Sequence, residues 1–475
     1  MEIATPPNFE TSLKFAKHNL NINFELKDQQ LLTLRHLYEG NDCIAVLPTG
    51  YGKSVIFQLL PWLLQKDMSN PGMVIVVCPL NSLMQDQVLS LCDRGIKACF
   101  LNSQGTAGKT YKMISRQTDV EKQEEEEENE EDEDEVTEND IHAPTYVNIK
   151  ELRQGEFNII YAHPETLLNN KTVGSLLRSP LFQEKVCAVV IDEVHMISEW
   201  GPKFRKAFKK LSEVICIFAD AAHLALTATA TPQAVKELAA DLQFVDFKTI
   251  RINPDRVNIF LEIQTRLPNI RKHEKLDNLI QPLAEDLSNR LAEFPLTVVY
   301  INNDEALGYC YQYVARHLKE KAYIPTESHI PENRIFAQYH KAYTDEMKTH
   351  IVCELRKENP KIRLVLATVA LGMGLNAPSI RRVIHFQPPT TLEKYLQEIG
   401  RAGRDGKKSS ALLYYNKNDI AKNREDMTEA MIKYCTNRTT CLRLQLVSYF
   451  GFDSVIFSDN PADCCINCRT AQKGM

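Results

Sequence analysis

The chain has 475 residues, of which 44% are hydrophobic and 25% are charged, and its formal net charge is −6. This length predicts two or three domains rather than a single core. No apolar run reaches the roughly 18 residues that a membrane-spanning helix needs, which excludes an integral membrane protein. The N-terminus lacks the pattern of a signal peptide, and cysteines within apolar runs are typical of reduced core residues, so we expect an intracellular protein.

A glycine-containing loop follows the apolar run 44–47 and leads into a second apolar run, 55–60. A buried strand, a glycine loop and a helix in this order are typical of a site for a nucleoside triphosphate. Gly50 and Gly52 permit a tight turn whose N–H groups point at phosphate oxygens, while Lys53 supplies a positive charge and Ser54 a ligand for Mg²⁺. The predicted nucleotide-binding set of this loop is Thr49, Gly50, Tyr51, Gly52, Lys53 and Ser54.

Apolar runs rich in β-branched residues alternate with helical patterns along the rest of the chain. The runs are 73–77, 158–161, 187–191 and 224–226, followed by 296–301, 363–367, 383–386 and 411–415. Continuous apolar runs are typical of parallel strands covered on both faces. The sequence therefore predicts two α/β domains in tandem, joined near residues 253–255, and then a mainly helical segment from 419 to 450.

The acidity of the chain is confined to one segment. Residues 121–140 carry fourteen acidic side chains and one lysine, a net charge of −13, which leaves +7 for the other 455 residues. Such a block repels itself and cannot form a core, so we expect a disordered surface loop. It is either a solvated insertion without a role or a mimic of nucleic-acid phosphates that competes for a basic groove or recruits a basic partner.

Two acidic residues, Asp192 and Glu193, follow the apolar run 187–191. Side chains at the carboxyl end of a parallel strand project into the crevice where such sheets bind ligands. We expect Asp192 to hold Mg²⁺ together with Ser54, and Glu193 to polarise the water that attacks the γ-phosphate. The alternative is an ordinary pair of capping carboxylates before a helix.

A second catalytic segment, 397–406, combines two arginines with three glycines. Arg401 and Arg404 are candidate arginine fingers, because a planar and permanently charged group neutralises the charge that develops on a transferred phosphoryl group. With the glycine loop on one domain and these arginines on the other, we expect ATP to bind between them. Closure on ATP and reopening after hydrolysis are typical of a motor protein.

The order of these segments resembles the RecQ helicases of superfamily 2 over residues 26–468. Lys27 and Gln30 match the adenine-reading motif, 79–87 and 162–165 match strand-contacting motifs, and Thr227 and Thr229 lie in the segment 226–230 that couples hydrolysis to movement. Residues 371–376 and 397–406 match the last two motifs, which assigns Gln397 to the catalytic set together with Lys53, Asp192, Glu193, Arg401 and Arg404.

The resemblance also implies how the chain is divided. It gives an N-terminal extension over 1–20 and a first RecA-like lobe over 21–253 with a disordered acidic insert over about 104–150. A second RecA-like lobe then covers 254–418, and a helical zinc-binding subdomain covers 419–475.

The segment 195–205 resembles the aromatic-rich loop with which RecQ enzymes sense single-stranded DNA. Trp200 and Phe204 can stack on bases without reading their sequence, while His195 and Arg205 link the loop back to the acidic pair. The alternative is that the two aromatic residues belong to the core. Beyond this loop, Asn302 replaces a usual family residue and is expected to contact a DNA phosphate.

A group of cysteines stands near the C-terminus: Cys441, and then Cys464, Cys465 and Cys468. Four thiolates suffice for a closed tetrahedral Zn²⁺ site, and two cysteines separated by two residues grip one metal from a tight turn. We expect Cys441 to contribute its ligand from a helix over 438–451. A disulfide and idle thiols are the alternatives. The cysteine doublet and Tyr51 resemble the Werner-type branch of the family, and Cys435 is expected to be buried outside the site.

We therefore expect an ATP- and Mg²⁺-dependent DNA helicase or translocase that acts on single-stranded and partly duplex DNA. The resemblance implies 3′ to 5′ movement, a role in DNA repair or recombination, and nuclear residence. A winged-helix module is not recognised after the zinc segment, so we expect duplex separation to be weak or to depend on a protein partner. The alternatives are an RNA helicase of the same superfamily and a DNA-binding or annealing scaffold that does not unwind.

Overall fold

A computed structural model describes most of the chain. The described residues are 8–65, 70–79, 81–101, 111–112, 146–147, 149–194, 211–267, 276–368 and 377–473. The acidic segment 121–140, the aromatic-rich segment 195–205 and the motif 371–376 lie outside these residues, so the predictions made for them stay predictions. Among the described residues, no helix is both long enough and apolar enough to span a membrane.

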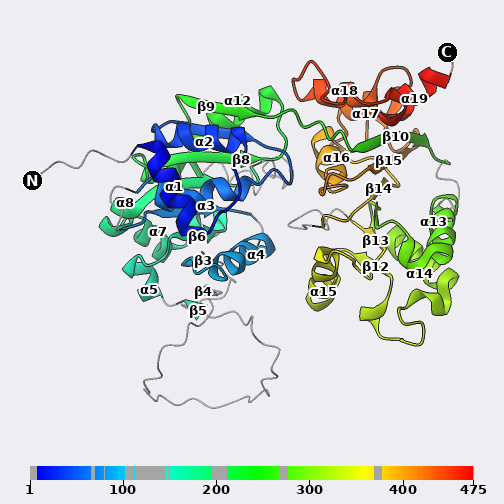
Figure 1. Ribbon diagram of the computed structural model, residues 1–475, viewed down its shortest axis with the longest axis horizontal. Helices are drawn as coiled ribbons and strands as arrows, with labels where there is room; N and C mark the ends of the chain where they lie inside the picture. The colour runs from blue at the N-terminus through cyan, green and yellow to red at the C-terminus, as the bar shows by residue number, and fades with distance from the viewer. Residues whose placement is uncertain are drawn as a thin grey trace, which may run out of the picture. The chain divides into compact units, whose positions relative to one another are not determined.

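The chain forms two compact units (Figure 1). The first unit contains Met1–Leu47, Gly52–Thr227 and Ala234–Arg251. The second contains Ile252–Met475 together with two short segments from earlier in the chain, Pro48–Tyr51 and Ala228–Gln233.

A seven-stranded sheet forms the centre of the first unit, with the strand order β3-β6-β2-β7-β8-β1-β9. Every pairing in this sheet is parallel. Its strands are β1 (Asp42–Val46), β2 (Met73–Val77), β3 (Ala98–Leu101), β6 (Ile159–Ala162), β7 (Val186–Ile191), β8 (Ala222–Thr227) and β9 (Phe247–Arg251). The apolar runs are buried along nearly their whole length, as a sheet covered on both faces requires. A separate antiparallel ribbon pairs β4 (Tyr111–Lys112) with β5 (Tyr146–Val147).

Helices cover this sheet. They are α1 (Phe9–Asn19), α2 (Asp28–Tyr38), α3 (Lys53–Leu63), α4 (Asn81–Cys92), α5 (Ile149–Gln154), α6 (Pro164–Asn169), α7 (Lys171–Leu177), α8 (Pro180–Lys185), α11 (Leu211–Ile217) and α12 (Pro232–Leu242). Helix α1 lies within the predicted N-terminal extension, where Asn8 caps it by accepting a hydrogen bond from Thr11 N. It contacts α3 and buries Phe9, Leu13 and Ala16, so it belongs to the packed body of the first unit.

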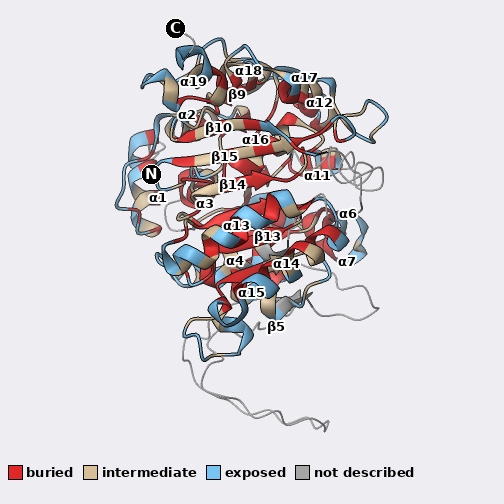
Figure 2. Cartoon of the chain, turned by 90° about the vertical axis from the view of Figure 1, so that its right-hand side faces the viewer, coloured by how far each residue is buried: buried red, intermediate tan, exposed pale blue. Residues whose placement is uncertain are grey.

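The second unit contains a six-stranded parallel sheet with the order β10-β15-β14-β11-β13-β12. Its strands are β10 (Ile259–Thr265), β11 (Thr297–Tyr300), β12 (Phe336–Tyr339), β13 (Leu364–Ala367), β14 (Arg382–His385) and β15 (Ser409–Tyr415). One face packs on α13 (Asp277–Arg290) and α14 (Asp304–Leu318). The other face packs on α15 (Asp345–Arg356) and α16 (Leu392–Ile399). Figure 2 shows the resulting burial of the strands.

The C-terminal helices share the core of the second sheet. They are α17 (Glu429–Thr436), α18 (Leu442–Tyr449) and α19 (Ile466–Lys473). Met431, Leu446 and Phe450 pack in one cluster with Ile259 and Leu261 of the edge strand β10. Two parallel-sheet domains followed by a helical segment are therefore confirmed, and that segment packs directly on the second sheet (Figure 1).

Candidate functional site

The glycine loop makes a tight turn that leads directly into a helix. Gly50 and Gly52 have φ angles of 82° and 90°, which only glycine adopts without strain. Tyr51 N donates to Pro48 O at 3.0 Å and closes the turn. Helix α3 begins at Lys53 directly after this turn, so its first N–H groups and the positive end of its dipole are available to an anion.

Gln30 braces the loop from the preceding helix, α2. Its Nε2 donates to Gly52 O at 3.0 Å, and its Oε1 accepts from Lys27 N at 2.8 Å. The side chain is buried, and a Cβ added to Gly52 would lie 2.7 Å from Nε2. The residue expected to read adenine therefore also fixes the conformation of the phosphate loop, which its position in the sequence did not indicate.

The acidic pair lies at the carboxyl end of β7. Asp192 is 7% exposed, and its Oδ1 accepts from Glu193 N at 2.9 Å. Burial, and after it the charge of Glu193, raise the pKa of Asp192 to about 7, although the charge of Lys53 and the hydrogen bond from Glu193 N oppose the rise. Glu193 has a φ of 53°, an uncommon conformation for a non-glycine residue that is frequent at functional sites.

These residues come from strands that are neighbours in the sheet. The order β7-β8-β1 places Asp192, Thr227 and the start of the glycine loop at the carboxyl ends of adjacent parallel strands. Leu47 N donates to Thr227 O at 2.9 Å, and Lys53 Nζ donates to Leu47 O at 3.4 Å. The Asp192 carboxylate offers the oxygen ligand that Mg²⁺ prefers, while Lys53 and the N-terminus of α3 fit the phosphate oxygens that would share the ion.

The predicted residues of the second unit lie on and after α16. Gln397 Nε2 donates to Thr229 Oγ1 at 3.2 Å, which brings together two residues that the sequence assigned to separate motifs. Arg401 is 7% exposed just beyond the helix, and Arg404 is half-buried. Asn302 is exposed after β11. The predicted DNA contacts His195, Trp200, Phe204 and Arg205 lie outside the described residues.

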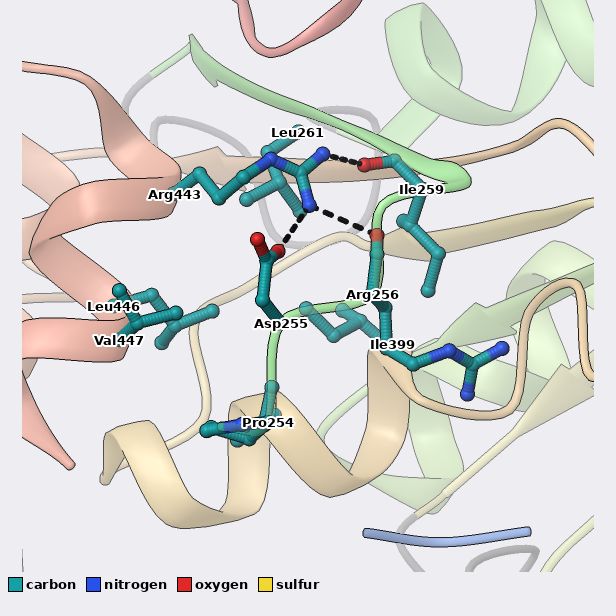
Figure 3. A pocket seen from close by; sticks show the side chains of 10 residues that line it. Pro254, Asp255, Arg256, Ile259, Leu261, Ile399, Arg443, Leu446 and Val447 are labelled. Atoms are coloured by element: carbon teal, nitrogen blue, oxygen red, sulfur yellow. Dashed lines mark hydrogen bonds and ion pairs between the residues drawn. The ribbon is translucent and has the colours of Figure 1, made fainter. Parts of the chain in front are cut away.

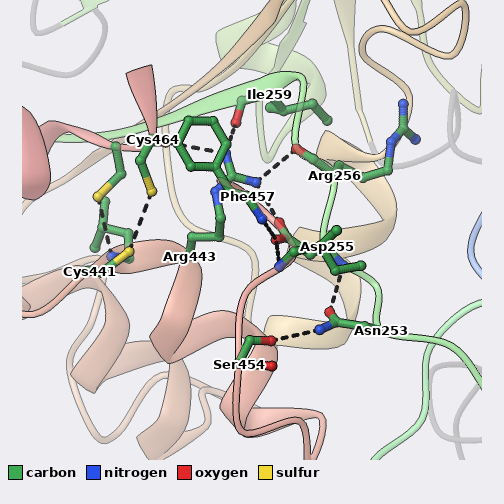
Figure 4. A network of polar contacts seen from close by, with 12 residues as sticks. Asn253, Asp255, Arg256, Ile259, Cys441, Arg443, Ser454, Phe457 and Cys464 are labelled. Carbon is green, nitrogen blue, oxygen red and sulfur yellow. Dashed lines mark hydrogen bonds and ion pairs between the residues drawn. The ribbon is translucent and has the colours of Figure 1, made fainter. Parts of the chain in front are cut away.

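The four C-terminal cysteines form a cluster whose Sγ atoms all lie within 4.8 Å of one another. Figure 4 shows two of them, Cys441 and Cys464. The Sγ–Sγ distances are 3.5 Å for Cys441–Cys464 and 3.6 Å for Cys465–Cys468, and none of the four is in a disulfide. Tetrahedral zinc with Zn–S bonds of about 2.3 Å requires sulfurs about 3.8 Å apart. The cluster therefore fits Zn²⁺, and its cysteines are free thiols in the structure.

The environment of the cluster favours a cation. Hydrogen bonds from Cys441 and Cys464 hold the pKa of Cys465 far below its ordinary value, whereas the pKa of Cys464 is raised by its bonds to Cys441 and Cys465. Four thiolates within 4.8 Å of one another would repel, so a cation between them is what permits them to ionise together. Leu442 N also donates to Cys465 Sγ at 3.4 Å. Cys435 is buried outside the group, as predicted.

The helix expected over 438–451 begins later, at Leu442, so Cys441 is its N-cap. The reason is a turn built by Asn437, whose Oδ1 accepts from Thr439 N and Thr440 N at 3.1 and 3.0 Å. A side chain that bonds local backbone in this way competes with the helix.

Three family models match the chain. The model for the DEAD/DEAH box helicase matches residues 27–238, that for the helicase conserved C-terminal domain matches 293–406, and that for RecQ zinc-binding matches 403–469. Together they cover the glycine loop, the arginine segment and the cysteine cluster.

Several curated proteins are similar over nearly the whole chain. The ATP-dependent helicase SGS1 of Saccharomyces cerevisiae is 28% identical over 94% of this chain and 27% of its own length. The RecQ-like DNA helicase BLM of Xenopus laevis is 27% identical over 96% of this chain and 30% of its own length. The ATP-dependent DNA helicase RecQ of Haemophilus influenzae is 28% identical over 87% of this chain and 57% of its own length. The chain thus spans about a third or less of the first two and just over half of the third.

Solved structures agree on the fold. The DUF1998 helicase MrfA bound to DNA and AMPPNP superposes with a TM-score of 0.62 at 16% identity, over 96% of this chain and 55% of that one. Dbp5 of S. cerevisiae bound to RNA and ADP BeF3 superposes with a TM-score of 0.56 at 15% identity, over 90% of this chain and 91% of that one. Both lobes are therefore RecA-like. The zinc-binding match and the named relatives agree with the motif order, and the chain belongs to the RecQ family of helicases.

Proposed function

We propose that this chain is an ATP-dependent DNA helicase or translocase whose ATP hydrolysis is stimulated by single-stranded DNA. The observation that carries the proposal is the pairing of a phosphate-binding loop with a four-cysteine cluster inside the RecQ zinc-binding match. RNA helicases of the same superfamily share the first feature and lack the second. Relatives named as DNA helicases support the same reading.

The chemistry assigned to the nucleotide site follows from its charges. The backbone N–H groups of the glycine loop and Lys53 bind the phosphates, and Glu193 orients the attacking water. Mg²⁺, held by Ser54 and Asp192, would neutralise charge on the phosphate oxygens. Gln397, Arg401 and Arg404 complete the catalytic set as donors to the transferred phosphoryl group.

Three finer assignments belong to the proposal through family resemblance alone. Movement is 3′ to 5′, the protein acts in DNA repair or recombination within the nucleus, and its closest likeness is to the Werner-type branch. We further propose that Trp200 and Phe204 sense the single strand, that Asn302 contacts its backbone, and that a partner protein assists duplex separation.

A second candidate function rests on one relative. The putative ATP-dependent RNA helicase R290 of Acanthamoeba polyphaga mimivirus is 29% identical over 94% of this chain and 70% of its own length. RNA is therefore the substrate class against which DNA has to be compared.

The test measures steady-state ATP hydrolysis alone, with single-stranded DNA and with single-stranded RNA, at several salt concentrations. Lys53→Ala should abolish turnover while DNA binding, followed by fluorescence anisotropy, is retained. Lys236→Ala is the matched control, because Lys236 is an exposed lysine of the same unit on α12. Stimulation by RNA alone would establish the second candidate. Absence of turnover in folded wild-type protein would leave a non-unwinding scaffold.

A further inference from the structure

A short segment between β9 and β10 contacts the turn that carries the catalytic arginines. The Arg256 Nη1 atom donates to Gly400 O at 3.1 Å. Its Nη2 atom donates to Ala402 O at 3.0 Å and to Gly403 O at 2.8 Å. One guanidinium therefore binds three carbonyls that immediately surround Arg401.

These carbonyls lie just beyond helix α16, which ends at Ile399, so they are outside its hydrogen-bond ladder. Gly403 O also accepts from Gly406 N at 3.0 Å, which closes the turn that Arg256 binds. One planar guanidinium with several N–H groups can bind all three carbonyls in a fixed geometry. A lysine ammonium is a compact point charge and has no such plane. Arg256 therefore fixes the path of the backbone between Arg401 and Arg404.

A second side chain of the segment holds the same turn. Asn258 Nδ2 donates to Gly403 O at 2.8 Å and to Lys407 O at 2.9 Å. Gly403 has a φ of 56°, and a Cβ placed there would lie 2.3 Å from that same amide nitrogen. The close approach thus requires both the asparagine and the glycine.

The opposite side of the segment is bound to the C-terminal helices (Figure 4). The Asp255 carboxylate accepts from Arg443 Nη1 at 2.5 Å, and from the N–H groups of Ile456 and Phe457 at 2.8 and 3.2 Å. Arg443 also donates to Arg256 O at 2.8 Å. Both charged side chains are almost completely buried, at 1% exposure for Asp255 and 2% for Arg443.

Arg443 extends the connection to the cysteine cluster. It lies on α18, whose N-cap is Cys441, and its Nη2 donates to Cys464 O at 3.3 Å. The apolar side chains around the pair, among them Pro254, Leu396 and Leu446, leave a cavity of only about 10 Å³ (Figure 3). This space holds at most about one water molecule. The region is therefore a packed joint and not a ligand site.

We propose that Arg256 is a positioning residue for Arg401 and Arg404, and that the Asp255–Arg443 pair makes this positioning depend on the cysteine-bearing helices. The inference rests on the proposed ATPase function. Arg256 binds carbonyls of the arginine turn with its side chain and accepts from Arg443 with its backbone oxygen. A displacement of α18 is therefore transmitted to the arginine turn through Asp255 and Arg256.

The first experiment compares Arg256→Gln and Arg256→Lys with wild type in DNA-stimulated ATP hydrolysis. A misplacement of about 1 Å in a catalytic group lowers turnover by about 100-fold. We expect kcat to fall about 10- to 100-fold in Arg256→Gln and by less in Arg256→Lys. Because the hydrogen bonds of the Arg256 side chain go to the arginine turn, and neither substitution changes a residue of the nucleotide-binding loop, the affinity for a non-hydrolysable ATP analogue should stay within about twofold.

The matched control is Arg334→Gln. Arg334 is also part-buried in the second unit and donates to the hydroxyl groups of Tyr311 and Tyr323, but it makes no contact with the arginine turn. Its replacement should leave kcat unchanged. Equal losses of kcat in the two glutamine variants would indicate general destabilisation and overturn the proposal.

The second experiment does not depend on catalysis. Amide hydrogen exchange over residues 400–406 should become at least tenfold faster in Arg256→Gln, and also in Arg443→Lys, which acts only through Asp255 and the backbone. Unchanged exchange in both variants would overturn the inference even if wild type hydrolyses ATP. If wild type proves inactive while exchange responds as expected, the proposed function fails and the positioning role stands.

Discussion

The buried Asp255–Arg443 pair gives a quantitative prediction for stability. Arg443→Met removes the cation. Among the described residues, the Asp255 carboxylate, 1% exposed, then keeps only the backbone N–H groups of Ile456 and Phe457 as hydrogen-bond partners. Breaking a buried ion pair by removing one partner costs about 3–5 kcal/mol, because the other charge stays buried. We expect a loss of free energy of unfolding in this range.

A double-mutant cycle separates the ion pair from the packing of the two side chains. Asp255→Asn keeps an oxygen that accepts the N–H groups of Ile456 and Phe457 but carries no charge. The double variant Asp255→Asn/Arg443→Met therefore leaves no uncompensated charge. We expect the double variant to lose less free energy of unfolding than the two single variants lose together, by about 1–3 kcal/mol.

The assay is urea unfolding at pH 7, followed by circular dichroism, on the four proteins of the cycle. Arg290→Met is the control for loss of an exposed arginine, because Arg290 is 49% exposed and lies 3.9 Å from Asp286. It should cost less than about 1 kcal/mol. Additive losses in the cycle, or a loss for Arg443→Met no larger than that of the control, would refute the reasoning.

Three further predictions concern single sites. Gly403→Ala should lower kcat without weakening nucleotide binding, because its Cβ would lie 2.3 Å from a neighbouring amide nitrogen; an unchanged kcat would show that the turn tolerates a shift. Burial acts to raise the pKa of Glu354, but hydrogen bonds from a lysine ammonium and a backbone N–H outweigh it, so the pKa lies below its ordinary value. The stability this carboxylate gives is therefore full above about pH 4.5 and is lost as the pH falls through the lower folded pKa. We expect the free energy of unfolding of Glu354→Gln to be about 2 kcal/mol below that of wild type at neutral pH, and this difference should disappear in acid. A difference that does not depend on pH would contradict the assignment. Cys465→Ser should release zinc, measured with a chromogenic chelator, and lower the melting temperature, whereas Cys435→Ser should keep the metal; equal zinc content in both would remove Cys465 from the site.

The fold was predictable where the signal is local. The runs 73–77 and 187–191 are apolar at every position, and the structure places them side by side as β2 and β7. Their continuous burial requires a parallel sheet with both faces covered. The order of the strands was not predictable in this way, because it depends on pairings between residues that are distant in the sequence, such as Asp42 with Phe247 and Ala98 with Ile159.

The residues of the candidate site were likewise predictable where the signal is local and not where it depends on distant contacts. The glycine loop and the acidic pair were found because a few adjacent residues carry the pattern, whereas the bracing of Gly52 by Gln30 joins residues 22 positions apart. Arg256 and Arg443 were missed entirely. A lone arginine in a sequence resembles a surface residue, and the burial of Arg443 arises from a partner 188 positions away.

Charge placement around β10 explains how the C-terminal helices hold their position. This strand is at the edge of its sheet, and an exposed edge offers unpaired N–H and C=O groups to other chains. Here the cysteine segment covers it, since Leu261 N donates to Cys464 O at 3.5 Å and pairs with Cys465 in a parallel bridge.

Two buried ion pairs bracket that covered edge. Asp255 precedes β10 and binds Arg443, whereas Arg266 follows it and makes two hydrogen bonds, of 2.6 and 2.8 Å, to the carboxylate of Asp419. Buried pairs of this kind add little net stability compared with apolar residues, but a shifted alignment would leave their charges unpaired in the interior at a cost of several kcal/mol. The pairs therefore fix the register between β10 and the cysteine segment. It follows that the cysteine cluster, the edge of the second sheet and the segment leading to the arginine turn are aligned by the same few charges.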